Sequence, residues 1–261
     1  MTFATWNLLF TGMVSSILLL NVVQWGIYRE RIYGLYTLYM LAWLVYFSLR
    51  IDEINNHVSA NIWYFVRATA PILAYFVYFD FADTLIKLQS RLPGLFRLFR
   101  VAKGIILAYL ILMGVLCFGI ADRHDTLYDT AHTVMRLLMV GLATYGIIKI
   151  RQLNGVVPRY VALGSAYILV GGIASMVLSM TNHSIGKPQP FLTAPLTYLE
   201  FGILAELICF TLVLGYRQRR GLSRVLLLSS DSPESANATS ANRLKLNWLP
   251  KNYNNRCRPC K

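Results

Sequence analysis

The run LTAPLTYLEFGILAELICFTLVLGY, residues 192–216, decides the fold class of this chain. A helix needs about 20 mostly apolar residues to cross the hydrocarbon core of a bilayer, and this run is long enough. It nevertheless contains two carboxylates, Glu200 and Glu206. Because ionisable groups inside a membrane are costly and usually face other helices, the two glutamates predict that this span belongs to a bundle.

The composition of the whole chain indicates a membrane protein. Of its 261 residues, 56% are hydrophobic and only 14% are charged, and the mean hydropathy is +0.49. Soluble domains carry about a quarter charged residues. We therefore predict an all-α membrane protein, a seven-transmembrane helix bundle. The seven predicted spans cover about residues 5–28, 32–49, 62–82, 104–120, 130–149, 160–180 and 192–216.

The basic residues predict the orientation of this bundle, because Lys and Arg are enriched in the cytoplasmic loops of membrane proteins. With the N-terminus outside, only Arg50, Arg123 and Lys187 fall on the outer side. The inner side then holds Arg29, Arg31, Lys87, Arg91, Arg97, Arg100, Lys103, Lys149, Arg151, Arg159, Arg217, Arg219 and Arg220. We predict an outer N-terminus and a cytoplasmic C-terminus. Since the basic residues separate apolar runs, the formal charge of +13 does not indicate a nucleic-acid partner.

The chain changes character after the last span. Residues 1–220 form the predicted membrane domain, and residues 221–261 are rich in Ser, Asn and Pro without periodicity. We expect the exit helix to break at Gly221 and a disordered, basic cytoplasmic tail to follow. The tail ends in CRPC, but no second cysteine pair or histidine completes a zinc site there. The abrupt change near Ser223 is also compatible with a truncated or frameshifted remnant.

Three charged residues inside predicted spans share one depth. Arg67, Arg136 and Glu200 lie in spans that run from outside to inside, and each falls roughly 8–12 Å below the outer surface at 1.5 Å per residue. We expect them to form one buried cluster near an outer-facing cavity. The net charge of this cluster would be positive, which leaves room for an anion or for a second carboxylate.

Glu206 lies about two helical turns deeper than Glu200. Asn21 in the first span reaches a similar depth, and the first and last helices of a bundle are often neighbours, so the sequence allows an Asn21–Glu206 hydrogen bond. Glu206 also shares a helix face with Gly202 and Arg217, which leads toward the cytoplasm. Glu206 and Asn21 therefore join the three residues above as candidates for ligand or signal sensing. The alternative is that these buried polar groups only fix helix packing, at about 0.6 kcal/mol each.

Catalytic chemistry finds no support in the sequence. The last span has no lysine for a retinal Schiff base, and the chain has no HExxH motif. Ser165 has no histidine at matching depth, apart from His132 near the outer surface. We predict no catalytic residues, no metal and no cofactor, and no enzymatic activity.

Two stretches resemble the bacterial seven-transmembrane receptors with diverse intracellular signalling modules. In GILAELICFTLVLGYRQR, residues 202–219, the matching positions are Gly202, Glu206, Thr211, Leu214 and Arg217. In NVVQWGIYRERIYGLYTLY, residues 21–39, they are Asn21, Arg29, Glu30, Tyr33, Tyr36 and Tyr39. The resemblance covers about residues 5–220.

The resemblance implies a multi-pass receptor of the bacterial inner membrane. Family members usually carry an extracellular ligand-binding domain before the first span and a coiled coil with a kinase or cyclase module after the last one. This chain departs from that pattern at both ends. We therefore expect a receptor core without an output enzyme, which relays an outer-side signal to a separate cytoplasmic partner, a histidine kinase or similar protein.

Arg217, Arg219 and Arg220 are the predicted cytoplasmic relay of this receptor. The chief alternative is a small-molecule or ion transporter, in which the charged cluster would be a substrate site. Broken helices near the midplane favour transporters, and Pro71 and Gly171–Gly172 are the positions that hint at them. A third reading is a membrane scaffold with purely structural charges. Besides the lipid bilayer and the signalling partner, a homodimer is left open.

Overall fold

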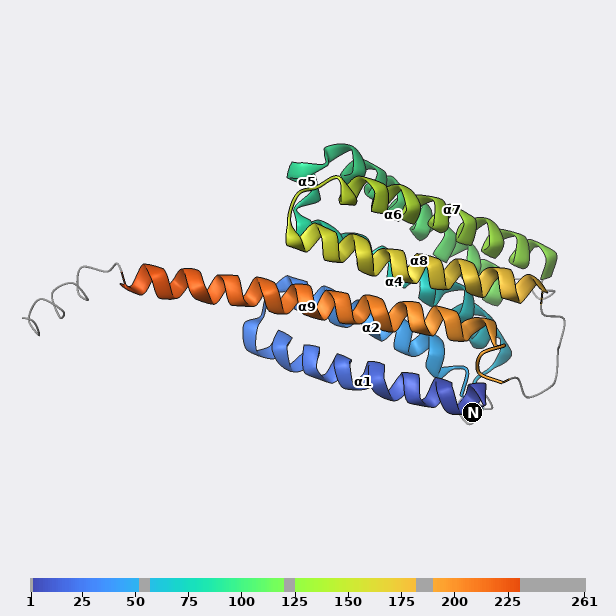
Figure 1. Cartoon of the computed structure of the whole chain (residues 1–261). Helices are drawn as coiled ribbons and strands as arrows, with labels where there is room; N and C mark the ends of the chain where they lie inside the picture. Colours follow the sequence, from blue (N-terminus) through green and yellow to red (C-terminus); the bar gives the residue numbers. More distant parts are fainter. Residues whose placement is uncertain (1, 52–56, 120–124, 182–189, 231–261) are drawn as a thin grey trace, which may run out of the picture. The chain divides into compact units, whose positions relative to one another are not determined.

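The computed structural model describes residues 2–51, 57–119, 125–181 and 190–230, and these residues are almost entirely helical (Figure 1). Within them no strand is formed, apart from an isolated antiparallel bridge between Thr2 and Pro190. The elements are α1 (Phe3–Tyr28), α2 (Arg31–Ser48), α4 (Ala60–Ile86), α5 (Leu88–Arg91), α6 (Pro93–Gly114), the π-helical η1 (Val115–Gly119), α7 (Asp125–Arg151), α8 (Val156–Thr181) and α9 (Pro195–Ser230).

The chain divides into two compact units, Met1–Thr211 and Leu212–Lys261. The division falls inside α9. The first unit contains every other helix and the part of α9 in which Glu200 and Glu206 lie. The described part of the second unit, residues 212–230, is the remainder of α9.

Six helices of the described residues are long and apolar enough to cross a membrane. They span Phe3–Tyr28, Ala60–Ile86, Pro93–Gly119, Thr126–Arg151, Val156–Met180 and Pro195–Arg219. Helix α1 exposes large aliphatic side chains along its length, such as Leu8, Leu19 and Ile27. Such a surface suits contact with lipid chains. The chain is therefore a multi-pass membrane protein, as the composition predicts.

Helix α2 matches the second predicted span, 32–49, but is not among these six. Its hydropathy is lowered by tyrosines at 33, 36 and 39, whose rings are buried. The helix packs against α1 and α4, beside which it runs (Figure 1). An inner helix of a bundle faces protein rather than lipid, so it tolerates hydroxyl groups that find partners. The helix itself is confirmed, and its crossing of the membrane stays a prediction.

Two helices extend beyond the bounds that the sequence predicts. Helix α6 begins at Pro93 rather than near residue 104. Its first turns bury Leu95 and Phe99, and the Phe99 ring stacks on Phe79 of α4 at 4.4 Å between centroids. These contacts stabilise additional helical turns before the apolar run that begins near residue 104. Helix α9 continues through Gly221 to Ser230, because a single glycine costs a helix only about 1 kcal/mol.

The remaining tail, residues 231–261 with Cys257 and Cys260, lies outside the described residues.

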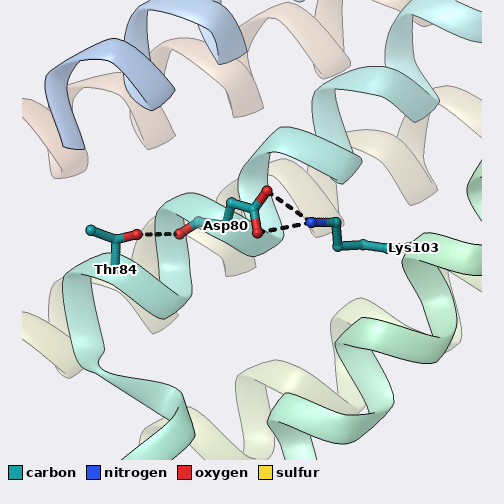
Figure 2. Close-up of polar contacts among 3 residues, drawn as sticks. All are labelled: Asp80, Thr84 and Lys103. Carbon is teal, nitrogen blue, oxygen red and sulfur yellow. Dashed lines mark hydrogen bonds and ion pairs between the residues drawn. The ribbon is translucent and has the colours of Figure 1, made fainter. Parts of the chain in front are cut away.

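An ion pair joins α4 to α6 at the end of α4 that the sequence places inside. Lys103 Nζ lies 2.8 Å and 2.9 Å from the two carboxylate oxygens of Asp80, and Thr84 Oγ1 donates to the Asp80 carbonyl oxygen at 2.8 Å (Figure 2). Lys103 Nζ also lies 4.4 Å from the centre of the Phe76 ring. The pair adds a polar tie to two helices already in aromatic contact.

Glycines bring α8 and α9 into backbone contact. A Cβ atom added at Gly171 would lie 2.4 Å from the carbonyl oxygen of Tyr198, and one at Gly202 would lie 2.7 Å from that of Tyr167. Neither position has space for a side chain. Small residues that let two backbones approach are a common basis of helix association in membranes. Gly202, which matches the receptor family, thus has a packing role.

Candidate functional site

The first unit contains a cavity of about 280 Å³ bounded by α2, α4, α7, α8 and α9. We call it the arginine cavity, because Arg50, Arg67 and Arg136 line it together. Its other side chains with polar atoms include Tyr46, Tyr75, His132, Ser175 and Ser179. Its apolar wall includes Trp43, Pro71, Ile72, Met139, Leu196 and Leu199.

Aromatic rings orient two of the three guanidinium groups. The Arg67 guanidinium lies 5.0 Å from the centre of the Trp63 ring, and the Arg50 guanidinium lies 4.9 Å from that of Tyr46. Arg50 also donates from Nη2 to the Tyr46 hydroxyl at 2.9 Å. Such cation–π contacts are attractive and restrict the flexible side chain. The Nε of Arg50 is buried and has no hydrogen-bond partner in the described part of the chain.

No described carboxylate neutralises the arginine cavity. None lines it, and none of the described residues places a carboxylate within ion-pair distance of Arg50, Arg67 or Arg136. The expected cluster is therefore only partly correct: Arg67 and Arg136 come together, and Glu200 does not pair with them.

Glu200 is instead fully buried and does not line the cavity. Its side chain lies close to that of Trp6 but outside hydrogen-bond geometry, since both carboxylate oxygens and Trp6 Nε1 are buried without a partner. The helical rise predicted the common depth of Arg67, Arg136 and Glu200. It could not predict the direction in which each helix turns its side chain.

Glu206 is fully buried inside the first unit. The Tyr39 hydroxyl of α2 donates a hydrogen bond to Glu206 Oε2. One turn earlier on α2, the Tyr36 hydroxyl donates to the Leu207 carbonyl oxygen at 2.9 Å and lies 3.3 Å from Thr211 Oγ1. Two neighbouring tyrosines thus hold α2 to the segment of α9 around Glu206.

The hydrogen bond that the sequence allows between Asn21 and Glu206 is not formed. Asn21 is buried, but its Nδ2 donates to the carbonyl oxygen of Ile17 in its own helix at 3.0 Å. The side chain of an asparagine can bond the backbone one turn away, which removes the need for a partner on another helix. The partner of Glu206 comes from α2, which packs between α1 and α4.

A second cavity, of about 30 Å³, lies beside Glu206. Tyr39, Tyr75 and Tyr78 contribute to its lining, and the Tyr78 hydroxyl is 2.5 Å from Ser165 Oγ. Tyr75 and Met139 line both this cavity and the arginine cavity. The two cavities therefore share a wall, and Glu206 lies behind it.

Four residues of this arrangement are not among the candidate site residues predicted from the sequence: Arg50, His132, Tyr39 and Tyr75. Arg50 carries a signal, because it directly follows an apolar run and falls on the predicted outer side, where basic residues are rare. Tyr33, Tyr36 and Tyr39 carry part of the family resemblance, but their spacing alone does not predict a contact with Glu206. Nothing in the sequence pairs Tyr75 with a residue of α9.

The remaining candidates lie elsewhere. Arg217, Arg219 and Arg220 belong to α9 in the second unit. The described residues contain no group of three His, Cys, Asp or Glu side chains that could hold a metal ion. Cys117 and Cys209 are both buried.

Sequence comparison identifies the family of the chain. No curated protein and no solved structure matches it. The sequence model of the 7TM diverse intracellular signalling family matches residues 3–217. This range covers every described helix before α9 and the part of α9 up to Arg217. The match confirms the resemblance carried by residues 21–39 and 202–219, and it indicates a receptor-like role in the membrane. This helical multi-pass chain belongs to the 7TM diverse intracellular signalling family.

Proposed function

We propose that the chain is the seven-span core of a bacterial inner-membrane receptor, with its N-terminus outside and its C-terminus in the cytoplasm. The arginine cavity receives a signal in the outer half, α9 carries the response inward, and a separate cytoplasmic signalling partner such as a histidine kinase reads it. The core has no catalytic activity of its own. Family membership and the arrangement around Glu206 support this proposal.

The observation that carries the proposal is the position of Glu206. This buried carboxyl group is held by Tyr39 and stands behind the wall of the arginine cavity. It belongs to α9, the helix in which Arg217 also lies. The Tyr39–Glu206 hydrogen bond is buried, and buried polar groups are sensitive to the loss of a partner. A displacement of the wall that the two cavities share would therefore disturb this bond.

A transporter is the second candidate, because the arginine cavity could also serve as a substrate site. Transport folds often use discontinuous helices near the midplane. Here α4 runs without interruption through Pro71, and α8 runs through Gly171 and Gly172. Gly171 is explained by the close contact of α8 with α9 and does not require a break in the helix. The continuous helices favour the receptor. Substrate flux into liposomes that depends on Arg67 and Arg136, which line the cavity, would instead favour the transporter.

The test is complementation of a deletion strain of the bacterium of origin, with transcript profiles as the measurement. We expect the wild-type chain to restore the profile and Glu206→Ala to fail at equal membrane abundance, because the α2–α9 bond is lost. Ile208→Ala is the matched control, since this neighbouring side chain of α9 is 56% exposed. Full restoration by Glu206→Ala would contradict a signalling role for this residue.

A further inference from the structure

We infer that the arginine cavity binds a small organic anion with a carboxylate or phosphate group on an apolar body. This assignment names the ligand class for the proposed receptor. Binding itself stands on the geometry of the cavity, and only the transmission to α9 rests on the proposed function.

The charge of the cavity favours an anion. Arg50 and Arg136 are half-buried, Arg67 is exposed, and no described carboxylate lies within ion-pair distance of any of them. Cations in partly desolvated sites are stabilised by a counter-charge. The guanidinium group bonds carboxylates and phosphates through two parallel N–H groups. The buried, unpartnered Nε of Arg50 leaves such a donor unused.

The cavity is organised before a ligand arrives. Trp63 holds the guanidinium of Arg67, and Tyr46 holds that of Arg50 by its ring and its hydroxyl. Side chains that are already ordered lose less conformational freedom on binding. Flexible surface arginines would not provide this arrangement.

The apolar wall and the volume define the rest of the ligand. Trp43, Ile72, Met139 and Leu199 face the cavity together with the arginines. Ligand pockets usually have an apolar lining with a few polar groups, and volumes of about 300–1,000 Å³. A cavity of about 280 Å³ is at the small end of that range. It suits an acid group attached to a compact hydrocarbon or aromatic body.

The shared wall connects this ligand to Glu206. The ring centroids of Trp43 and Tyr75 are 6.4 Å apart, and those of Tyr39 and Trp43 are 6.3 Å apart. Both pairs have edge-to-face geometry. Tyr39 in turn donates to Glu206. A ligand that displaces Trp43 or Tyr75 therefore changes the packing around Tyr39, which is hydrogen-bonded to Glu206 of α9.

Two sources can supply this chemistry: a free organic acid, or the headgroup of an anionic lipid. The experiment uses the full chain in phosphatidylcholine nanodiscs and titration calorimetry with benzoate and inorganic phosphate. Benzamide is the uncharged analogue of benzoate. Arg67→Gln and Arg136→Gln remove charges of the cavity, and Arg97→Gln is the control, an exposed arginine of α6 outside every described cavity.

We expect benzoate or phosphate to bind wild type and Arg97→Gln alike, and to bind Arg67→Gln and Arg136→Gln about tenfold to a hundredfold more weakly. Benzamide should not bind. Unchanged affinity in discs with phosphatidylglycerol indicates a free anion. Loss of benzoate binding in such discs, with arginine-dependent retention of phosphatidylglycerol in native mass spectra, indicates a lipid headgroup. The assignment is overturned if neither benzoate, phosphate nor phosphatidylglycerol binds in an arginine-dependent way.

Its failure can be separated from failure of the proposed function. Arginine-dependent anion binding together with full complementation by Glu206→Ala would retain the anion site and contradict the receptor. No anion binding together with lost complementation by Glu206→Ala would contradict the anion site alone.

Discussion

The two glutamates of α9 have opposite surroundings, although they are six residues apart and equally buried. Glu206 accepts a hydrogen bond from Tyr39, while both oxygens of Glu200 lack a partner among the described residues. A buried polar group without a partner costs about 1–3 kcal/mol in proteins. Glu206 is thus a polar tie between two helices, and Glu200 is not.

The bond between Tyr39 and Glu206 should contribute measurably to stability. We expect Tyr39→Phe to lower the free energy of unfolding by about 1–3 kcal/mol, because the buried carboxyl group loses its donor. Thermal or detergent-induced unfolding in micelles measures this loss. Tyr167→Phe is the control, since that side chain is 46% exposed on α8.

A double-mutant cycle isolates the bond from general packing. In a Glu206→Leu background, the additional change Tyr39→Phe should cost clearly less than it does in wild type, because no carboxyl group remains to be left unpaired. Equal losses in both backgrounds would mean that the hydroxyl acts independently of Glu206.

At the scale of elements, α2 and the α8–α9 pair organise the bundle in different ways. Helix α2 uses large aromatic side chains, and Tyr36, Tyr39 and Trp43 are among the largest fully buried residues. The α8–α9 pair uses the absence of side chains at Gly171 and Gly202. Large residues fill the space between distant helices, and glycines let close ones touch.

The contact of α8 with α9 predicts a strong effect of a single methyl group. Gly202→Ala places Cβ 2.7 Å from a backbone oxygen that cannot move away easily, so we expect a loss of about 1–3 kcal/mol in unfolding free energy. Gly141→Ala is the matched control, because no atom lies within 4 Å of its added Cβ.

Thermal unfolding of the two variants distinguishes these cases. Gly141→Ala should be neutral or more stable by up to about 1 kcal/mol, since alanine favours the helix. If Gly202→Ala were as stable as Gly141→Ala, the close approach of the two backbones would be incorrect.

At the scale of the whole molecule, the number of spans depends on α2. If α2 crosses the membrane, the connection between α1 and α2 and the connection before α4 lie on opposite sides, the first inside and the second outside. We expect Ser59→Cys to react with a membrane-impermeant maleimide in intact spheroplasts, and Glu30→Cys to react only after permeabilisation. Both positions are exposed, and the four native cysteines would first be replaced. Labelling of both variants, or of neither, in intact spheroplasts would contradict seven spans.

Most of the helices could be predicted from the sequence because a bilayer imposes length and apolarity on each of them separately. The predicted span 160–180 and α8, or 32–49 and α2, differ by only a few residues. The early start of α6 could not be predicted this way, because Leu95 and Phe99 extend that helix through contacts with other elements.

The sequence by itself determined the helical membrane class and the family, since these follow from composition and local pattern. Only the tertiary structure decided which charges meet. Arg50 joined Arg67 and Arg136, Glu200 was left without a partner, and Tyr39 rather than Asn21 reached Glu206. The physical reason is that a contact depends on the rotation of each helix about its axis and on its neighbours, which packing of the whole bundle determines.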